Sequence, residues 1–149
     1  MKFLADHMLG RLARWLRMFG YDTLYPRALK DNEIIKIVNK ENRVLLTRDK
    51  TLANSKNTKA ILIESVNIEK QLEQVVKEAN LKIKNPFSRC TICNYPIIKV
   101  EKKDVIKNVP EKVYQYNYEF WKCQNCSKIY WKGSHWEKIC EKIKFYRGI

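Results

Sequence analysis

Two Cys-x-x-Cys pairs constrain the fold of this 149-residue chain more than any other feature of its sequence. Cys90 and Cys93 form the first pair, and Cys123 and Cys126 form the second. Each pair can direct two sulfurs from one tight turn at the same ion, and four thiolates in a tetrahedral arrangement are a preferred structural zinc site. The sequence therefore predicts a small zinc ribbon, held together by one Zn²⁺.

A redox-active dithiol is the alternative interpretation of a Cys-x-x-Cys pair. Such a pair opens a thioredoxin-like βαβ unit, and neither pair here does so. The fifth cysteine, Cys140, follows Trp136 by four residues in a segment with helical spacing, so we expect it to be a buried apolar side chain. His135 is a further metal candidate. Because four thiolates are already available, a role at a turn or helix start fits it better than a substrate contact.

The first 86 residues alternate between strand-like and helix-like segments. Short apolar runs predict strands at residues 2–5, 22–25, 43–47 and 60–63. Apolar residues at helical spacing predict helices at residues 8–19, 32–40 after an Asp31 cap, and 67–79. This alternation is typical of an α/β domain with a parallel sheet and right-handed crossovers. The composition changes at Asn85-Pro86, so we predict a parallel-sheet domain at 1–86 and a zinc-ribbon module at 87–149.

The second module is expected to be rich in β-structure, with a C-terminal helix. We predict short strands at 95–100, 112–121 and 127–131 and a helix at 134–144. Three tyrosines alternate within the second of these strands and would share one face: Tyr114, Tyr116 and Tyr118. Trp121, Trp131 and Trp136 lie near the metal turns. Such aromatic rings can stack on unpaired bases, although most of them are expected to fill the core of a small module.

Acidic residues occur where strands of the predicted sheet meet the following helices. Asp6 and Asp49 follow the first and third strands, and Asp31 and Glu33 begin the intervening helix. The carboxyl ends of parallel strands share one edge, where functional groups collect. Clustered carboxylates suit a hard cation such as Mg²⁺ or Mn²⁺, and such an ion can activate water for attack on a phosphodiester.

Helix capping is the competing explanation for each of these acids. Asp is a favoured residue at a helix N-terminus, and every one of them precedes a helical stretch. Three such positions in a chain of formal net charge +14 nevertheless favour a metal site over capping alone.

The charge of the chain indicates a polyanionic partner, with RNA or DNA preferred over an acidic membrane surface. Four arginines close to the predicted acidic edge are candidate phosphate contacts: Arg11, Arg14, Arg17 and Arg48. Guanidinium groups bind phosphate bidentately and can stabilise the charge that develops during cleavage. The alternative is a basic, solvated helix face. His7 beside Asp6 has no clear assignment.

No stretch of about 18 apolar residues is present, so no membrane span is predicted. Asp6, Arg11 and Arg14 interrupt the only N-terminal run that could resemble a signal peptide. We therefore expect a cytoplasmic protein, in which free cysteines serve metal binding better than disulfides.

Several of these segments together resemble a known family. The blocks FLADHMLGRLARWLRMFGYDT, DNEII and RVLLTRDKTLA are similar to the PIN-like ribonuclease domain found at the C-terminus of mutator-type exoribonucleases. The blocks RCTICN and KCQNCSKIYWKGSHW resemble the zinc ribbon that follows it. The resemblance covers nearly the whole chain and implies a PIN-like fold and metal-dependent RNA cleavage.

Position by position, the resemblance places Asp6 at the acid of the first strand and Asp49 at the acid of the TRD block. Asp31 and Glu33 both fall in the middle acidic block, so either can be its ligand. A fourth acid of the wider PIN group has no secure counterpart, and Glu64 is the nearest. The sequence thus predicts a metal-dependent ribonuclease whose ribbon supports RNA binding. A non-catalytic RNA- or ribosome-binding protein is the alternative, and a DNA-repair or toxin-type nuclease is a third.

Overall fold

A four-stranded parallel sheet organises the first half of the chain. The computed structural model describes residues 1–149. The strand order is β2-β1-β3-β4, and all neighbouring pairs are parallel. The strands are β1 (Lys2–Ala5), β2 (Asp22–Leu24), β3 (Val44–Thr47) and β4 (Ala60–Leu62). The predicted α/β class with a parallel sheet is confirmed.

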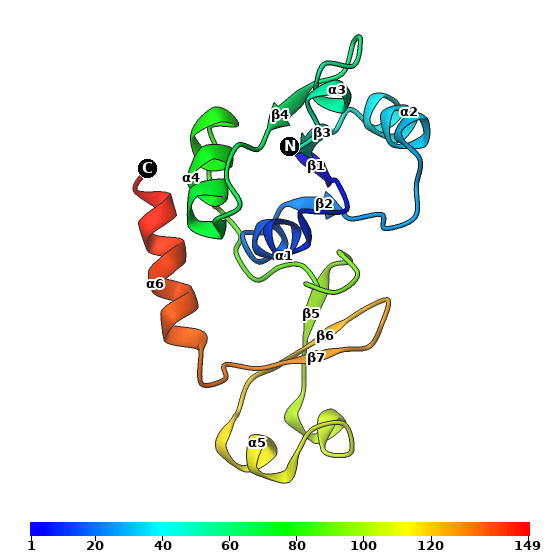
Figure 1. Ribbon diagram of the computed structural model, residues 1–149. Helices are drawn as coiled ribbons and strands as arrows, with labels where there is room; N and C mark the ends of the chain where they lie inside the picture. Colours follow the sequence, from blue (N-terminus) through cyan, green and yellow to red (C-terminus); the bar gives the residue numbers. More distant parts are fainter.

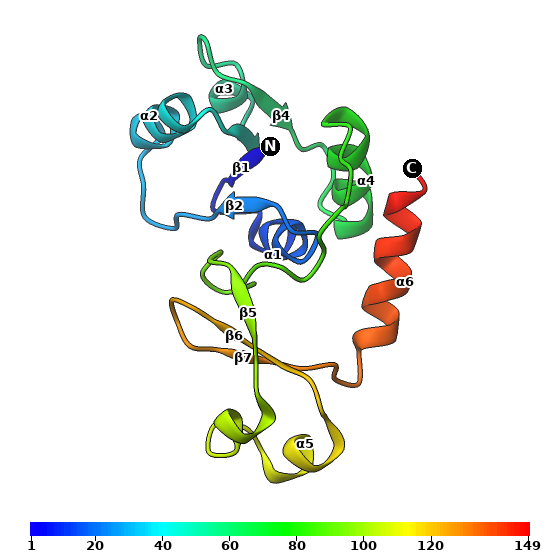
Figure 2. The same ribbon diagram turned by 180° about the vertical axis from the view of Figure 1, so that it is seen from behind.

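Helices cover both faces of this sheet. Alternate residues of a strand point to opposite faces, so Phe3 contributes to one core and Leu4 to the other. The first core lies under α1 (Gly10–Met18) and α4 (Ile68–Glu78), and the second lies under α2 (Asp31–Glu41) and the short α3 (Lys50–Ala53). Figures 1 and 2 show α1 and α4 on one side of the strands and α2 on the other. Burial on both faces explains why the strands are continuous apolar runs.

Helix α1 ends where a glycine is required. Gly20 has φ of +93°, its N–H bonds the carbonyl of Arg17, and the N–H of Tyr21 bonds the carbonyl of Leu16. This is the Schellman pattern, in which a glycine in the left-handed region satisfies the last free carbonyls of a helix. A Cβ at Gly20 would lie 2.2 Å from the carbonyl oxygen of Asn85. The glycine therefore both caps α1 and lets the connection to the second unit pass close to this helix.

The second unit is built on a three-stranded antiparallel sheet. Its strands are β5 (Ile97–Val100), β6 (Phe120–Cys123) and β7 (Ile129–Tyr130), in that order. A 3₁₀ turn (Lys102–Val105) and the helix α5 (Glu111–Tyr116) connect β5 to β6. These short elements form the end of the molecule farthest from the parallel sheet (Figure 1).

The predicted strand over 112–121 is wrong in its first half. A helix begins there at Glu111, directly after Pro110 at the N-cap, and an acidic residue in the first turn of a helix is favourable. Tyr114 lies on α5 and Tyr118 follows it outside any strand. The Lys102 ammonium lies 4.6 Å from the ring centroid of Tyr114 and 4.7 Å from that of Tyr118.

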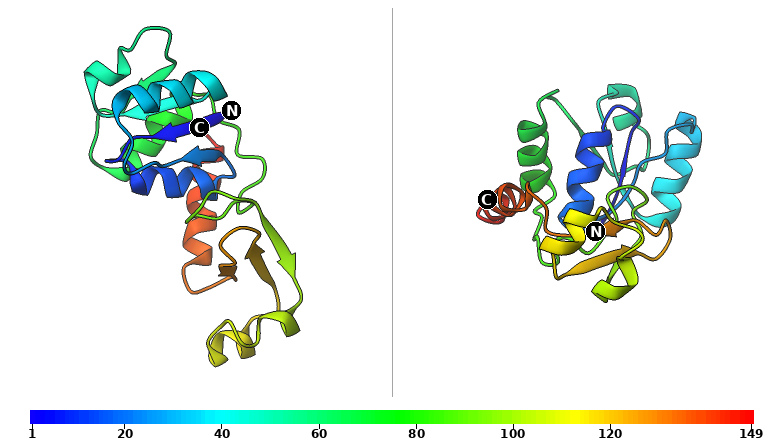
Figure 3. Two further views of the ribbon diagram at one scale, coloured as in Figure 1. Left: turned by 90° about the vertical axis from the view of Figure 1, so that its right-hand side faces the viewer. Right: turned by 90° about the horizontal axis from the view of Figure 1, so that it is seen from below.

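The C-terminal helix α6 (Trp136–Arg147) packs on the first unit. Ile143 and Tyr146 are buried in the same core as α1 and α4, and the Tyr146 hydroxyl donates to the carbonyl of Glu69 at 3.2 Å. The helix runs beside α4 in both ribbon views and connects the two units in Figure 3. The predicted boundary near residue 86 stays a prediction, but the last helix of the chain stabilises the domain that precedes that boundary.

A buried arginine joins the two units directly. The Arg17 side chain reaches from α1 to three carbonyl oxygens: its Nε donates to Thr23 at 2.9 Å, and its Nη1 donates to Thr91 at 3.0 Å and Ile92 at 3.1 Å. Thr91 and Ile92 are the two residues between the cysteines of the first pair. Arg17 is only 6% exposed, so this turn is held against the edge of β2 by hydrogen bonds to a charged donor, which are stronger than neutral ones.

Asn94 makes a second connection at the same edge. Its Oδ1 accepts from the backbone N–H of Thr23 at 2.9 Å, and its Nδ2 donates to Asp22 at 2.7 Å. Asp22 is also paired with the buried Arg43 at 2.7 Å. These bonds hold the pKa of Asp22 below its usual value, although burial opposes the shift. The free edge of β2 is thus covered by the first cysteine turn.

We predict that Arg17→Met lowers the free energy of unfolding by about 2–4 kcal/mol, because it leaves buried carbonyl acceptors without a donor. For a chain of this size the melting temperature should fall by roughly 5–10 °C. Calorimetry measures both values. Arg11→Met is the matched control, since Arg11 lies exposed on the same helix and should change stability by no more than about 0.5 kcal/mol. Equal melting temperatures for the two variants would contradict a structural role for Arg17.

Candidate functional site

The four paired cysteines converge on one point. The Sγ atoms of Cys90, Cys93, Cys123 and Cys126 all lie within 4.8 Å of one another. Cys90 and Cys126 are 3.7 Å apart, and Cys93 and Cys123 are 3.3 Å apart. With Zn–S bonds of about 2.3 Å, a tetrahedral site requires sulfurs separated by about 3.8 Å. The geometry therefore fits a Zn²⁺ ion held by the predicted four ligands.

Both cysteine pairs are built as the same kind of turn. In each, the residue after the second cysteine has a positive φ, 71° at Asn94 and 65° at Ser127, and its N–H bonds the carbonyl of the first cysteine. The N–H of Cys126 also points at Cys123 Sγ at 3.5 Å, an arrangement that favours a thiolate. Burial alone would raise the pKa of Cys93, but hydrogen bonds from Tyr95 and the neighbouring cysteine lower it to about 6.

Tyr130 supports the site from outside the ligand set. Its hydroxyl lies 3.0 Å from Cys90 Sγ and accepts from the N–H of Thr91 at 3.0 Å. Burial raises the pKa of Tyr130, so the hydroxyl keeps the proton that it can donate to the sulfur. Groups that orient metal ligands in this way commonly contribute substantially to metal affinity, so their substitution weakens metal binding. Sequence reasoning did not single out Tyr130, whose position beside Cys90 depends on the pairing of β6 with β7.

The fifth cysteine and the candidate histidine lie outside the cluster. Cys140 is partly buried on α6 and does not belong to the group of converging sulfurs. His135 is the exposed residue that directly precedes α6. Its place at a helix start agrees with the role expected from the sequence.

Asp6 and Asp49 are connected through a buried threonine at the carboxyl edge of the parallel sheet. The Thr47 hydroxyl donates to Asp6 Oδ2 at 2.9 Å and accepts from the backbone N–H of Asp49 at 3.0 Å. Asp6 Oδ1 accepts the N–H of His7 at 2.7 Å and lies 3.0 Å from the His7 ring. Asp6 is 7% exposed, so these bonds hold a nearly buried carboxylate in one orientation. Thr47 is a positioning residue that the sequence analysis missed, although it is the last residue of a buried strand.

Asp49 also caps a helix. Its Oδ1 accepts from the N–H of Thr51 at 2.8 Å and of Leu52 at 3.1 Å. The capping interpretation is therefore correct for this residue. Its Oδ2 makes no hydrogen bond within the chain, and the residue is exposed, so one carboxylate oxygen remains available.

The middle acids differ from the expected arrangement. Asp31 was expected to be the N-cap of α2, but Lys30 occupies that position and Asp31 is the first helical residue. Glu33 provides the capping bond instead, because its carboxylate accepts from the N–H of Lys30 at 2.8 Å. Both acids are exposed. Glu64, the nearest counterpart of a fourth acid, is exposed after β4.

The acids do not come as close together as the cysteines. No three carboxylates in the chain have oxygens within 4.8 Å of one another. Mg²⁺ retains several waters and is commonly held by one or two carboxylates together with substrate phosphates. Asp6 and Asp49 are joined through Thr47 and the Asp49 backbone N–H, and their side chains are the oxygen donors at this edge that could take part in such a site.

The four arginines separate into three kinds. Arg11 and Arg14 lie exposed on α1, three residues apart, and therefore on one face. Arg17 does not belong to this exposed stripe, because its guanidinium is buried against backbone carbonyls. The prediction that Arg17 contacts phosphate is therefore wrong, because its guanidinium is occupied by carbonyl oxygens inside the protein. Arg48 is partly buried beside Asp49, and its Nε is enclosed without a hydrogen-bond partner.

The structure thus defines the chain as an α/β protein with a parallel sheet, joined to a small antiparallel unit whose four cysteines are positioned to bind a metal ion. The family model of the Mut7-C RNAse domain matches residues 1–143, which include both units. The chain belongs to this family, and RNA is therefore implied as its substrate or partner. No curated protein and no solved structure matches the chain. None of its helices combines the length and apolar composition that crossing a membrane requires.

We predict that the purified protein holds close to one Zn²⁺ per chain. Cys93→Ser should lose the ion and unfold residues 87–149 first, since metal binding contributes to the folding free energy of small modules. Cys140→Ser is the matched control and should retain full zinc. Elemental analysis and thermal unfolding measure the two effects. Zinc-free wild-type protein purified without chelators, or loss of zinc from Cys140→Ser, would contradict the ligand assignment.

Proposed function

We propose that this protein is a metal-dependent ribonuclease that hydrolyses RNA phosphodiester bonds. The observation that carries the proposal is membership of the Mut7-C RNAse domain family together with the Asp6–Thr47–Asp49 connection at the carboxyl ends of β1 and β3. Ligands of open α/β sheets bind at this edge. The cytoplasm, a reducing compartment that contains RNA, is the proposed location.

Each residue of the proposed active site has a distinct task. Asp6 and Asp49 would hold Mg²⁺ or Mn²⁺, with Asp31 or Glu33 as a further oxygen donor. A bound divalent ion supplies charge neutralisation and an activated water. Thr47 restricts Asp6 to one orientation, and the α3 N–H groups restrict Asp49 in the same way. Fixed carboxylates lose less entropy when an ion binds than mobile ones do.

Arginines would position the RNA backbone. Arg11 and Arg14 extend from the helix that follows Asp6, and Arg48 directly precedes Asp49. An exposed guanidinium can bind a phosphate through two hydrogen bonds. The net charge of +14 raises the local concentration of any polyanion over the whole surface.

A non-catalytic RNA-binding protein is the second candidate. The observation that favours it is the separation of the acids, since only the four cysteines form a close group of potential ligands. The capping bonds of Asp49 and Glu33 also give these two residues structural roles without any metal. The two candidates share RNA as partner and differ in whether the acids take part in chemistry.

We expect Asp6→Asn and Asp49→Asn each to abolish Mn²⁺-dependent cleavage while preserving the fold and RNA affinity. Asparagine keeps the size and capping capacity of aspartate but removes the charge that the cation needs. Labelled single-stranded and structured RNA, with Mg²⁺ or Mn²⁺, provides the assay. Asp31→Asn and Glu33→Gln, made separately, should identify the middle ligand. Asp104→Asn, an exposed acid of the second unit, is the control and should cleave normally.

Two results would decide against this assignment. If wild-type protein cleaves no RNA with either ion, the RNA-binding interpretation takes its place. If the Asp6→Asn/Asp49→Asn double variant cleaves as fast as wild type, the active site lies elsewhere.

The double variant Arg11→Ala/Arg14→Ala should bind single-stranded RNA more weakly, to a similar extent for different sequences. The log–log slope of affinity against salt should become shallower by roughly 1.4, about 0.7 for each lost phosphate contact. Lys40→Ala/Lys59→Ala removes the same charge at the opposite edge of the sheet, where α2 ends and β4 begins. Fluorescence anisotropy at several salt concentrations measures both. Equal slopes for the two double variants would show that Arg11 and Arg14 form a solvated surface without specific phosphate contacts.

A further inference from the structure

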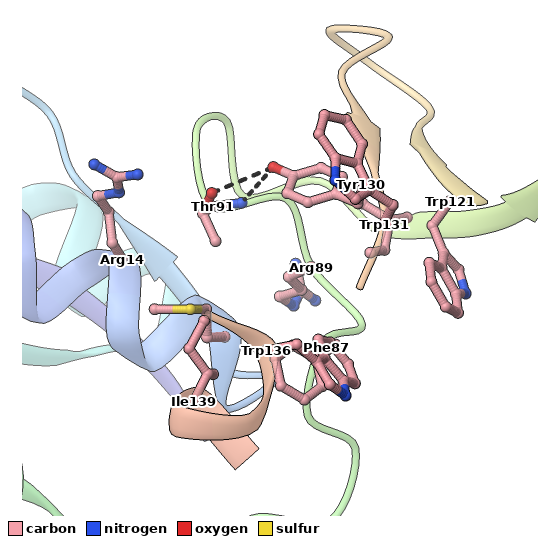
Figure 4. A pocket seen from close by; sticks show the side chains of 11 residues that line it. Arg14, Phe87, Arg89, Thr91, Trp121, Tyr130, Trp131, Trp136 and Ile139 are labelled. Atoms are coloured by element: carbon pink, nitrogen blue, oxygen red, sulfur yellow. Dashed lines mark hydrogen bonds between the residues drawn. The ribbon is translucent and has the colours of Figure 1, made fainter. Parts of the chain in front are cut away.

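A hollow lined by aromatic rings lies where the two units and α6 meet. It has a volume of about 220 Å³, smaller than the roughly 300–1,000 Å³ typical of sites for drug-sized ligands. Its walls come from three sources: α1, the segment that enters the second unit, and the antiparallel sheet with α6 (Figure 4). A hollow of this size accepts one flat ring system.

Aromatic side chains dominate its walls. Trp121, Trp131 and Trp136 all line it, which is three of the four tryptophans of the chain. Phe87 is packed against Trp136 with ring centroids 4.3 Å apart and an angle of 34° between the planes. All four rings are only partly buried, so they are not simply core residues. Aromatic faces of this kind stack on unpaired bases in a sequence-tolerant way.

Positive charge surrounds these rings. Arg14 and Arg89 belong to the lining, and no carboxylate does. Arg89 uses Nη1 to hold the carbonyl of Asn94 at 2.7 Å, which keeps its guanidinium in place beside the rings (Figure 4). The combination of flat apolar walls with two arginines, one of them fixed, is complementary to a nucleotide, whose base is apolar on both faces and whose phosphate is anionic.

The hollow continues into a wider basic groove. Both are lined by Tyr130, Trp131 and Trp136, and the groove adds Lys112, Lys128 and Lys132 without any acid in its lining. On the other side of the hollow, Arg11 lies one helical turn from Arg14 and nearer to the carboxyl edge of the sheet. A strand with one base in the hollow would therefore meet cations in both directions.

We infer that this hollow is a nucleotide-binding site that takes one unpaired base of an RNA strand, stacked on tryptophan and bound through its phosphate to Arg14 or Arg89. The inference rests on the proposed function for the choice of RNA as ligand. According to this inference, the junction of the two units holds the RNA strand, and this binding site is distinct from the proposed active site at Asp6 and Asp49. Cleavage of the RNA strand and binding of its unpaired base would then take place at two different sites of the same chain.

Tryptophan fluorescence tests this directly, because most of the indoles of the protein line the hollow. The probe is a single-stranded RNA hexamer in buffer without added Mg²⁺ or Mn²⁺, so that binding is observed without the cleavage reaction. We expect saturable quenching. Inorganic triphosphate is the polyanion control and should cause little change. Equal quenching by triphosphate, or no quenching by the hexamer at concentrations that bind by anisotropy, would overturn the inference.

Trp131→Ala should weaken hexamer binding by roughly 5- to 150-fold, the range found when a stacking ring is removed. Tyr118→Ala is the matched control, since this ring is 81% exposed and lines neither hollow nor groove, and its affinity should stay within about twofold of wild type. Circular dichroism and zinc content show whether Trp131→Ala is folded. Equal affinity of the two variants would contradict the inference.

Photo-crosslinking of the wild-type protein to an RNA hexamer that contains 4-thiouridine tests the same site without a substitution that could disturb the fold. Adducts should map to Phe87, Trp121, Trp131 or Trp136. Adducts confined to the Asp6 edge or to residues 114–118 would overturn the assignment. If the hollow binds RNA but no RNA is cleaved, the nuclease proposal fails alone. If cleavage is normal but the tryptophans do not respond, the nucleotide site fails alone.

Discussion

The buried guanidinium of Arg17 is the interaction on which the rest of this structure depends. It projects from a helix of the parallel-sheet domain and bonds three carbonyl oxygens, two of them inside the first cysteine turn. Burial lowers the pKa of Arg17, whereas nearby Cys90 and Cys93 oppose that shift. A cation in this position is favourable beside a site whose four thiolates and one Zn²⁺ would carry a net negative charge. Hydrogen bonding and electrostatics at Arg17 therefore favour the same orientation of the two units.

That orientation creates the surfaces on which function depends. The cysteine turn covers the edge of β2, α6 returns to the core beside α4, and the space left among them is the aromatic hollow. Neither unit alone contains the full lining, because α1 supplies Arg14 and the second unit supplies the tryptophans. The acidic edge at Asp6 lies at the start of the same helix that carries Arg14. One helix thus links the proposed catalytic edge, the basic face and the junction between the units.

Much of the fold and of the metal site followed from local sequence patterns. Doubly covered strands are continuous apolar runs, the cap at Gly20 needs a residue that accepts positive φ, and paired thiolates need a tight turn. Errors arose where a pattern had two physical explanations. Alternating tyrosines suggested a strand, but a helix begins directly after Pro110 and two of the rings lie close to the Lys102 ammonium. Helical spacing placed Arg17 with the exposed arginines, although long cationic side chains can also enter a buried site when carbonyl partners satisfy them.

The sequence by itself determined the parallel α/β domain, the four converging cysteines and the strongly basic character of the chain, because each depends on local periodicity, short spacing or composition. Only the tertiary structure decided which polar groups meet. Thr47 joins Asp6 to Asp49 because neighbouring parallel strands bring residues 41 positions apart to one edge. Tyr130 reaches Cys90 because β7 pairs with β6 and β6 with the distant β5. The tryptophans and Arg14 line one hollow because the second unit and α6 pack against α1. Contacts of this kind depend on long-range packing, which no local pattern of residues encodes.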